Sequence, residues 1–337
     1  MGRIMQTQKT LMEVRNLKVH FNIKSDNAWP WQKGHALKAV DGVDLTLYEG
    51  ETLGVVGESG CGKSTLARAL LRLVPITEGN VVWLGQDLTE LDKKQMRDKR
   101  QELQMIFQDP LASLDPRMTV GDIIAEPLHT FHPDWSKQTV KEAVRQMMDR
   151  VGLLPNVINR YPHEFSGGQC QRIGIARALI LKPKLIVCDE PVSALDVSIQ
   201  AQVVNLLKEL QAEMNLSLVF IAHDLSVVKH ISDRVLVMYL GNPVELASKH
   251  SLYAQPKHPY TKALMSAVPV PDPQIERNKS IQLLTGDLPS PINPPSGCVF
   301  RTRCPHATDV CQGQKPRLYP VSDDHQVACS RLEDIPA

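Results

Sequence analysis

Hydrophobic and polar residues alternate with the period of β-strands near the start of the chain and then recur with the period of a helix. Residues 11–21 and 43–47 alternate, which predicts two strands with one buried face. Residues 53–56 form a short apolar run, which is typical of a strand buried on both faces. Four leucines then recur at helical spacing: Leu66, Leu70, Leu71 and Leu73. We therefore expect a β-rich start followed by strand, loop and helix.

The middle of the chain has mainly the helical period. Residues 79–84 and 103–107 predict two more strands, whereas 119–128 and 138–152 have helical patterns. The apolar face of the second helix consists of Val140, Val144, Met147, Met148 and Val151. Because no strand pattern interrupts these helices, residues 110–181 are predicted to form a mostly helical subdomain inserted into an α/β core.

Strands and helices alternate again after this subdomain. The apolar run 185–190 ends in two carboxylates, a helical pattern follows at 198–214, and the predicted strand 217–221 delivers His223 at its carboxyl end. Ligands of open parallel sheets bind at the carboxyl ends of the strands. The pattern therefore predicts an α/β fold with its reactive residues at strand ends.

Residues 57–64 read Gly-Glu-Ser-Gly-Cys-Gly-Lys-Ser and match the phosphate-binding P-loop, G-x-x-x-x-G-K-[ST], between a predicted strand and helix. Its glycines let backbone N–H groups face the phosphates, while Lys63 adds positive charge and Ser64 is the expected Mg²⁺ ligand. The residues expected to contact the nucleotide are Gly57, Ser59, Gly60, Cys61, Gly62, Lys63, Ser64 and Thr65. The alternative is a glycine-rich turn that only caps a buried helix. We favour the P-loop, because all eight positions and both flanking elements match it.

Three further groups favour phosphate chemistry, although each is weaker alone. Ser166-Gly167-Gly168-Gln169 precedes a predicted helix, whose N-terminus can bind a second anion. Asp189 and Glu190 can place one acid on a metal ion and another beside the reacting water, with a plain acidic pair as the alternative. An isolated His223 would more often be structural, but in the company of a P-loop we favour a functional role.

The composition favours a globular protein without a membrane span. Of its 337 residues 42% are hydrophobic, which is enough for a substantial core. The apolar runs are far shorter than the ~20 residues that span a bilayer, and residues 1–13 lack the apolar segment of a secretory signal. A formal net charge of +1 counts against non-specific nucleic-acid binding. We therefore expect a cytosolic protein whose membrane role, if any, is peripheral.

Taken together, these motifs resemble the ATPase subunits of ATP-binding cassette (ABC) transporters. The shared motifs, in the order typical of that family, are the P-loop, Gln108, Ser166 to Gln169, Asp189-Glu190, Asp196 and His223. The resemblance covers residues 11–250. It implies a P-loop NTPase fold that has a RecA-like core, an antiparallel β subdomain and an inserted helical subdomain.

The resemblance also implies a role for each residue. Lys63 would hold phosphates, Glu190 would be the general base for water, and His223 would sense or stabilise the γ-phosphate. The implied Mg²⁺ ligands are Ser64, Gln108 and Asp189. Gln108 would also contact the water and link the site to membrane subunits.

In this family two ATPase subunits face each other head to tail, and the serine–glycine segment of one completes the ATP site of the other. The residues that would act in this way are Ser166, Gly168 and Gln169. Phe21 aligns with the aromatic adenine platform of the family, with Trp29 or Trp31 in the polar insertion 22–35 as alternatives. These tryptophans could otherwise pack on their own domain or form a partner surface.

The end of the chain carries a second resemblance. Residues 255–337 hold more than half of the 24 prolines, so 251–337 is predicted to be a loop-rich extension rather than more sheet. His258 to Leu264 and Pro289-Ser290-Pro291 look like the C-terminal region of dipeptide and oligopeptide importer ATPases, and Cys298 to Pro305 looks most like the F-type ATPase subunits of bacterial oligopeptide permeases. The implied partners are a second homologous ATPase subunit, two transmembrane permease subunits and an extracytoplasmic peptide-binding protein.

Four of the seven cysteines crowd into this extension: Cys298, Cys304, Cys311 and Cys329. Disulfides are disfavoured in a reducing cytosol, structural zinc usually uses a tighter C-x2–4-C pair, and four thiolates also suit a [4Fe–4S] cluster. Zinc and free thiols remain alternatives, while the resemblance to peptide-importer ATPases implies the cluster. We expect it to be structural rather than redox-active, because the cysteines lie far in sequence from every ATP-binding motif.

The hypothesis that follows is an ATP-hydrolysing subunit that drives oligopeptide uptake across the bacterial inner membrane from its cytoplasmic face. A related dipeptide or nickel importer is the nearest alternative. A non-transport ABC ATPase of DNA repair or translation would usually need a coiled coil, a second cassette or a basic face, none of which is evident. A subunit that binds ATP without hydrolysing it conflicts with intact Glu190 and His223.

Overall fold

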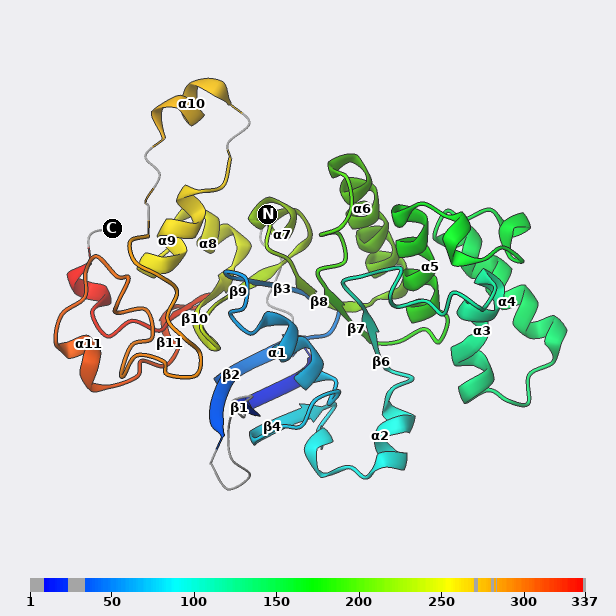
Figure 1. Cartoon of the computed structure of the whole chain (residues 1–337), viewed down its shortest axis with the longest axis horizontal. Helices are drawn as coiled ribbons and strands as arrows, with labels where there is room; N and C mark the ends of the chain where they lie inside the picture. The colour runs from blue at the N-terminus through cyan, green and yellow to red at the C-terminus, as the bar shows by residue number, and fades with distance from the viewer. Residues whose placement is uncertain (1–8, 24–33, 270–271, 280–281, 283, 336–337) are drawn as a thin grey trace. The chain divides into compact units, whose positions relative to one another are not determined.

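The structure is a computed structural model that describes residues 9–23, 34–269, 272–279, 282 and 284–335 (Figure 1). Within these ranges the chain divides into two compact units. The first is built mainly from residues 48–52 and 90–222, and the second from 10–47, 53–89 and 223 onwards. Trp29 and Trp31, the alternative adenine platforms, lie outside the described residues.

The first unit contains three parallel strands in the order β8-β7-β6. They are β6 (Leu103–Ile106), β7 (Leu185–Asp189) and β8 (Ser217–Ile221). Every residue of β7 and β8 is buried, as their continuous apolar runs predict. Helix α6 (Val197–Met214) lies between these two strands in sequence and buries one apolar face.

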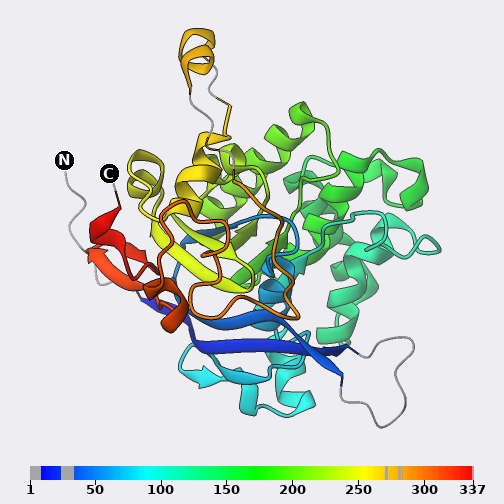
Figure 2. The same cartoon turned by 60° about the vertical axis from the view of Figure 1, so that its left-hand side comes forward.

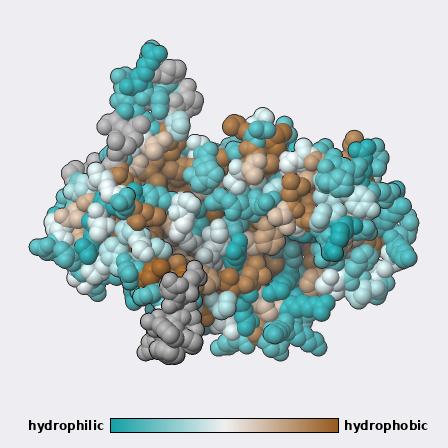
Figure 3. Space-filling view, in the orientation of Figure 1, coloured by the Kyte–Doolittle hydropathy of each residue, from teal (hydrophilic) through white to brown (hydrophobic). Residues whose placement is uncertain are grey.

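Residues 107–184, between β6 and β7, form helices and loops without a strand, as the sequence pattern predicts. The helices are α3 (Val120–Phe131), α4 (Lys137–Arg150) and α5 (Gly167–Leu179), with short 3-10 turns at Pro155–Val157 and Pro162–Glu164. Helices α3, α4 and α5 pack on one another and form the green group in Figure 1. The surface over α3 and α4 is mostly hydrophilic on the face drawn in Figure 3. The charged run near residue 95 forms the short helix α2 (Lys93–Lys99).

The second unit contains a four-stranded sheet in the order β2-β1-β4-β5. Its strands are β1 (Thr10–Ile23), β2 (His35–Tyr48), β4 (Glu78–Trp83) and β5 (Gln86–Asp87). Figure 2 shows β1 and β2 running side by side in blue. Both strands are longer than the alternating sequence patterns suggest, because they continue into residues 22–23 and 35–42.

The same unit holds a second group of strands that includes β3 (Thr52–Val56), β9 (Arg234–Tyr239) and β10 (Asn242–Ser248). Strand β3 pairs parallel to β9, which forms an antiparallel hairpin with β10. The short helices of this unit are α1 (Lys63–Leu70), α7 (Leu225–Ile231), α8 (Lys249–Ala254), α9 (Pro259–Ser266), α10 (Pro273–Asn278) and α11 (Val310–Gly313).

Two details differ from the sequence expectations. Leu73 lies beyond the end of α1 and is 42% exposed, so it does not belong to the buried face of that helix. The extension is rich in loops, but it also adds the hairpin β11 (Tyr319–Ser322) and β12 (His325–Val327), and β12 pairs with β10. Among the described residues, none of the helices has the length and apolar character required to cross a membrane.

Candidate functional site

The P-loop joins the end of β3 to the start of α1 in the second unit. Gly62 is the N-cap of α1 in a left-handed conformation (φ 101°), and a Cβ on it would lie 2.0 Å from the carbonyl oxygen of Ala39. Gly57 is similarly enclosed, since a Cβ there would meet the Met238 carbonyl at 2.2 Å. These two glycines are therefore required by the close approach of neighbouring backbone as well as by the turn.

Lys63 is 4% exposed, and its ammonium group lies inside the P-loop. Its Nζ donates to the carbonyl oxygens of Gly57 at 2.8 Å and Glu58 at 3.0 Å. The loop is also tied to the β9–β10 turn, where the Gly241 N–H donates to the Cys61 carbonyl at 2.9 Å. Cys61 is buried, and burial raises the pKa of its thiol. The arrangement places a cation at a helix N-terminus, which is suited to bind an anion.

Glu58 makes contacts that no sequence motif indicates. Its backbone N–H donates to the Tyr260 hydroxyl at 2.8 Å, and its carboxylate accepts from Nη1 of Arg303 at 2.8 and 3.1 Å. Both partners belong to the C-terminal extension. Its cysteines lie far in sequence from the ATP motifs, yet Arg303, the residue beside Cys304, contacts the P-loop.

Asp189, Glu190 and Gln108 lie together in the first unit. Asp189 is the last residue of β7 and is 1% exposed, and Glu190 follows it in a left-handed conformation (φ 48°). The Nε2 of Gln108 donates to Oε2 of Glu190 at 3.0 Å, although the two residues are 82 positions apart. Left-handed conformations of non-glycine residues are costly and are often found at functional sites. The structure thus brings the predicted glutamine and the predicted base into contact.

Ser166 is the N-cap of α5 and forms a capping box with Gln169. The Ser166 hydroxyl accepts from the Gln169 N–H at 3.4 Å, and the Gln169 side chain accepts from the Ser166 N–H at 3.0 Å. Both side chains are exposed, whereas Gly168 is buried and close to Ile199 of α6. The segment therefore presents a capped helix N-terminus at the surface of the first unit.

Of the remaining predicted residues of the ATP site, Ser64 and Thr65 are half-buried, whereas His223, Asp196 and Phe21 are exposed. His223 follows β8 after a single intervening residue, and Asp196 is the N-cap of α6. Phe21 lies near the end of β1 with 37% of its surface exposed. His223, Asp196 and Phe21 are therefore accessible from solvent.

The four cysteines of the extension lie close enough to influence one another electrostatically. Burial raises the pKa of Cys298 to about 11, and the thiolates of Cys304, Cys311 and Cys329 add to the effect. Cys298, Cys304 and Cys329 each accept a backbone hydrogen bond from the residue two positions later. Within the described parts of the chain, however, no three metal-ligating side chains are placed as the ligands of one ion. The thiols gather at one place without forming a ready-made single-ion site.

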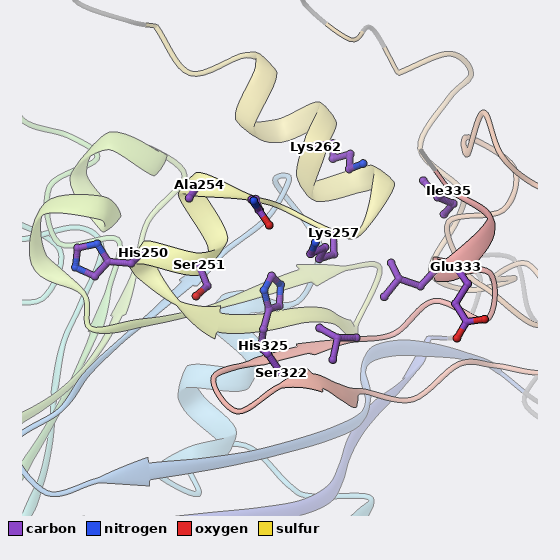
Figure 4. A pocket seen from close by; sticks show the side chains of 12 residues that line it. His250, Ser251, Ala254, Lys257, Lys262, Ser322, His325, Glu333 and Ile335 are labelled. Atoms are coloured by element: carbon purple, nitrogen blue, oxygen red, sulfur yellow. The ribbon is translucent and has the colours of Figure 1, made fainter. Parts of the chain in front are cut away.

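A cavity of about 680 Å³ lies among α8, α9 and the end of the extension, and none of its lining residues belongs to a predicted site (Figure 4). His325 on its wall contacts Oε1 of the fully buried Glu245 at 2.6 Å. Glu245 also accepts from the backbone N–H groups of Lys257 and His258. The His325–Glu245 contact attaches strand β12 to β10, and the three bonds together satisfy the buried carboxylate, so we assign them a structural role.

Two protein families match the chain. The family described as "ABC transporter" matches residues 40–193, and that described as "Oligopeptide/dipeptide transporter, C-terminal region" matches residues 244–311. The "Oligopeptide transport ATP-binding protein OppF" of Salmonella typhimurium is 67% identical over 99% of this chain and 100% of its own length. The proteins of the same name from Escherichia coli and Haemophilus influenzae are 66% and 65% identical, over 99% and 98% of this chain and 100% and 99% of their own.

Solved structures also resemble the chain. The ATP-binding cassette MJ0796, in a dimeric post-hydrolysis state bound to ADP and Pi, has a TM-score of 0.63 and 26% identity, and the match covers 71% of this chain and 99% of the cassette. The cbiO1 protein of Clostridium perfringens has the same TM-score at 22% identity, over 74% of this chain and 92% of its own, and supports the fold alone. The curated relatives match nearly the whole chain, extension included, whereas these solved structures match 71–74% of it.

Proposed function

Because the chain belongs to the oligopeptide transport ATP-binding proteins of the ABC transporter family, we propose that it hydrolyses ATP to power oligopeptide uptake across the bacterial inner membrane. The observation that carries this proposal is the 65–67% identity to oligopeptide transport proteins over nearly the whole chain, extension included. The fold is that of an ABC ATPase cassette. We propose a boundary between cassette and extension near residue 250; the family match to the C-terminal region begins at residue 244.

The P-loop is the proposed phosphate-binding element. Its buried Lys63 already bonds to two loop carbonyls, so binding of ATP replaces weak neutral acceptors by anionic oxygens. The remaining contacts come from Gly57, Ser59, Gly60, Cys61, Gly62, Ser64 and Thr65, with Phe21 as the adenine platform. Since Cys61 has a buried side chain, its contribution comes from its backbone N–H.

Glu190 is the proposed general base and Gln108 is its positioning partner. The amide of Gln108 donates to the Glu190 carboxylate at 3.0 Å, which fixes the orientation of the group that would accept a proton from water. His223 is the proposed sensor of the γ-phosphate. Mg²⁺ would be held by Ser64, Gln108 and Asp189, whose oxygen atoms are ligands that this ion prefers, and it would neutralise charge on the phosphates.

The serine–glycine segment is proposed to act on the ATP of a second, homologous ATPase subunit. The proposed residues are Ser166, Gly168 and Gln169 at the N-terminus of α5, of which Ser166 and Gln169 are exposed. The solved cassette with a TM-score of 0.63 is described as dimeric. The further proposed partners are two transmembrane permease subunits and an extracytoplasmic peptide-binding protein. We place the chain at the cytoplasmic face of the inner membrane as a peripheral subunit.

The four cysteines are proposed to hold a [4Fe–4S] cluster, with zinc as the alternative. Their mutual proximity, partial burial and N–H···S hydrogen bonds fit a cluster bound by four thiolates. Anaerobic purification should yield a brown protein with about four irons per chain. A colourless protein with zinc and no iron would exclude the cluster.

The function is tested by reconstitution. The chain should copurify with two permeases and a second ATPase, and the complex in liposomes should accumulate a labelled oligopeptide only when ATP is supplied on the side of the ATPases. Uptake of a labelled dipeptide and of Ni²⁺ is measured in the same way, because these are the cargoes of the alternative importers. Recovery of the chain with ribosomes or DNA, and without permeases, would contradict the proposal.

A further inference from the structure

The P-loop residue Glu58 is held by the C-terminal extension at two separate points. Its carboxylate accepts from Arg303, and its backbone N–H donates to the Tyr260 hydroxyl. Its carbonyl in turn accepts from Lys63. The ion pair is largely shielded from solvent, since the side chain of Arg303 is 10% exposed and that of Glu58 is 25% exposed. Contacts of this kind are stronger and more directional than pairs on an open surface.

A cluster of aromatic rings fixes the position of Arg303. Its guanidinium lies over the Tyr239 ring, 5.9 Å from the ring centre. Tyr239 packs against Tyr260 and Phe300 with ring centres 4.8 and 5.2 Å apart, and all three rings are buried. Phe300 and Arg303 belong to the turn between Cys298 and Cys304. The rings and the turn therefore present the cation to the P-loop with little freedom to move away.

The charge of Glu58 is otherwise unfavourable at this place. A carboxylate in a phosphate-binding loop repels the phosphates of an incoming nucleotide, and the repulsion is weakly screened in a half-buried site. Arg303 neutralises this carboxylate and also keeps it turned toward the extension. Loss of the guanidinium would leave a negative charge free to approach the phosphates and to bond to Lys63, the cation that they require.

We propose that Arg303 is a positioning residue for ATP binding, which holds and neutralises Glu58 so that the P-loop accepts phosphate. This inference rests on the proposed function, because it assumes that the P-loop binds ATP. It assigns to the extension a task that neither family match describes, namely to set the affinity of the cassette for nucleotide. The residue acts through Glu58 and is not itself catalytic.

The experiment is a titration of the full chain with a fluorescent ATP analogue and Mg²⁺. Arg303→Ala should raise the Kd for the ATP analogue on the order of tenfold. The reason is that the Glu58 carboxylate, no longer neutralised, then repels the phosphates bound to the same loop. Arg303→Lys should recover part of the affinity, because the ammonium group keeps the positive charge but cannot reproduce the guanidinium contact with Glu58. In the assembled transporter the KM for ATP should rise while kcat at saturating ATP stays constant. The matched control is Arg301→Ala, two positions away, whose guanidinium bonds to Ser296 instead.

The decisive comparison is Glu58→Gln. If the task of Arg303 is to neutralise Glu58, the double variant Glu58→Gln/Arg303→Ala should bind ATP within about twofold of Glu58→Gln alone. A double variant as weak as Arg303→Ala would overturn the inference, as would normal affinity in Arg303→Ala. Circular dichroism verifies folding, and Arg303→Met, which keeps the packing, replaces alanine if that variant unfolds. Failure of the wild-type chain to bind ATP would instead contradict the proposed function.

Discussion

Glu190 is the residue on which hydrolysis of bound ATP should depend. The change Glu190→Gln keeps the size of the side chain and its hydrogen bond with Gln108, but an amide cannot take a proton from water. We expect turnover of the assembled transporter to fall ~10²–10⁴-fold, because that is the usual contribution of a positioned general base. The affinity for ATP should be unchanged. The measurement is phosphate release at saturating ATP together with a binding titration.

The matched control for this change is Glu213→Gln. Glu213 is exposed and pairs with Arg150 on the surface of the first unit, at 3.3 Å. The same chemical change there should leave turnover unaffected. A Glu190→Gln transporter that hydrolyses ATP at the normal rate would show that another group is the base.

At the scale of residues, functional residues that belong to sequence motifs can be predicted. Residues whose role depends on contacts with distant parts of the chain cannot. The pairing of Gln108 with Glu190 follows from their motifs, although only the structure gives the hydrogen bond. The pairing of Glu58 with Arg303 has no such signal, because the residues are 245 positions apart and either could be an ordinary surface charge. Separation in sequence therefore does not show how close the extension lies to the P-loop.

At the scale of elements, helix α1 depends on the glycine that begins it. Gly62→Ala would place a Cβ 2.0 Å from the Ala39 carbonyl in a left-handed conformation. The backbone strain alone costs about 1–2 kcal/mol, and the clash must be relieved by moving the loop or strand β2. We expect a lower melting temperature and loss of ATP binding, measured by calorimetry and titration. Gly174→Ala is the control, since a Cβ there meets nothing within 4 Å and alanine favours helix α5.

Helix α9 should make stability dependent on pH. Its N-cap His258 is buried, and burial lowers the pKa to about 4, against a smaller opposing effect of Glu245. The unfolded state therefore binds more protons between about pH 6.5 and 4, so the free energy of unfolding should fall by up to about 3 kcal/mol as the pH drops through this window. His258→Asn keeps a capping oxygen and should remove most of this dependence in denaturant titrations. His129→Asn, an exposed position on α3, should leave it unchanged.

Strands β7 and β8 were predictable because continuous burial leaves a continuous apolar run, and α4 because its buried face repeats every third or fourth residue. The hairpin of β11 and β12 was not. Residues 319–322 are all exposed and include a proline, so no alternating pattern marks them. Their pairing depends on β10 and on the Glu245–His325 contact, which are distant in sequence.

At the scale of the whole molecule, the family could be predicted because its motifs are short and occur in a fixed order along the chain. The role of the extension could not be predicted in this way. The sequence shows how many cysteines the extension has. It does not show whether they lie close together in space, because that depends on the turns between them. The structure supports a link between the cysteine segment and the nucleotide site through the turn that carries Phe300 and Arg303. A cofactor that stabilises this turn would therefore also stabilise the P-loop. Its role would then extend beyond holding the extension together.

The last prediction concerns the sharing of ATP sites between subunits. If Ser166 serves the nucleotide of a partner, Ser166→Ala should leave ATP binding by this chain within about twofold of normal. Turnover of the assembled transporter should fall, because the partner's site loses a hydrogen-bond donor to the γ-phosphate and a capped helix N-terminus. The two measurements are a titration of the single chain and phosphate release by the complex.

Loss of an N-cap also destabilises a helix by ~1 kcal/mol, so the control must remove a cap elsewhere. Ser136→Ala does so at α4, where the serine hydroxyl accepts from the Thr139 N–H at 3.1 Å. It should lower stability to a similar extent while turnover stays normal. If both variants lost turnover equally, the effect of Ser166→Ala would be explained by the loss of helix stability alone. A Ser166→Ala chain that binds ATP tenfold more weakly on its own would show that the segment serves its own nucleotide, which would refute the shared site.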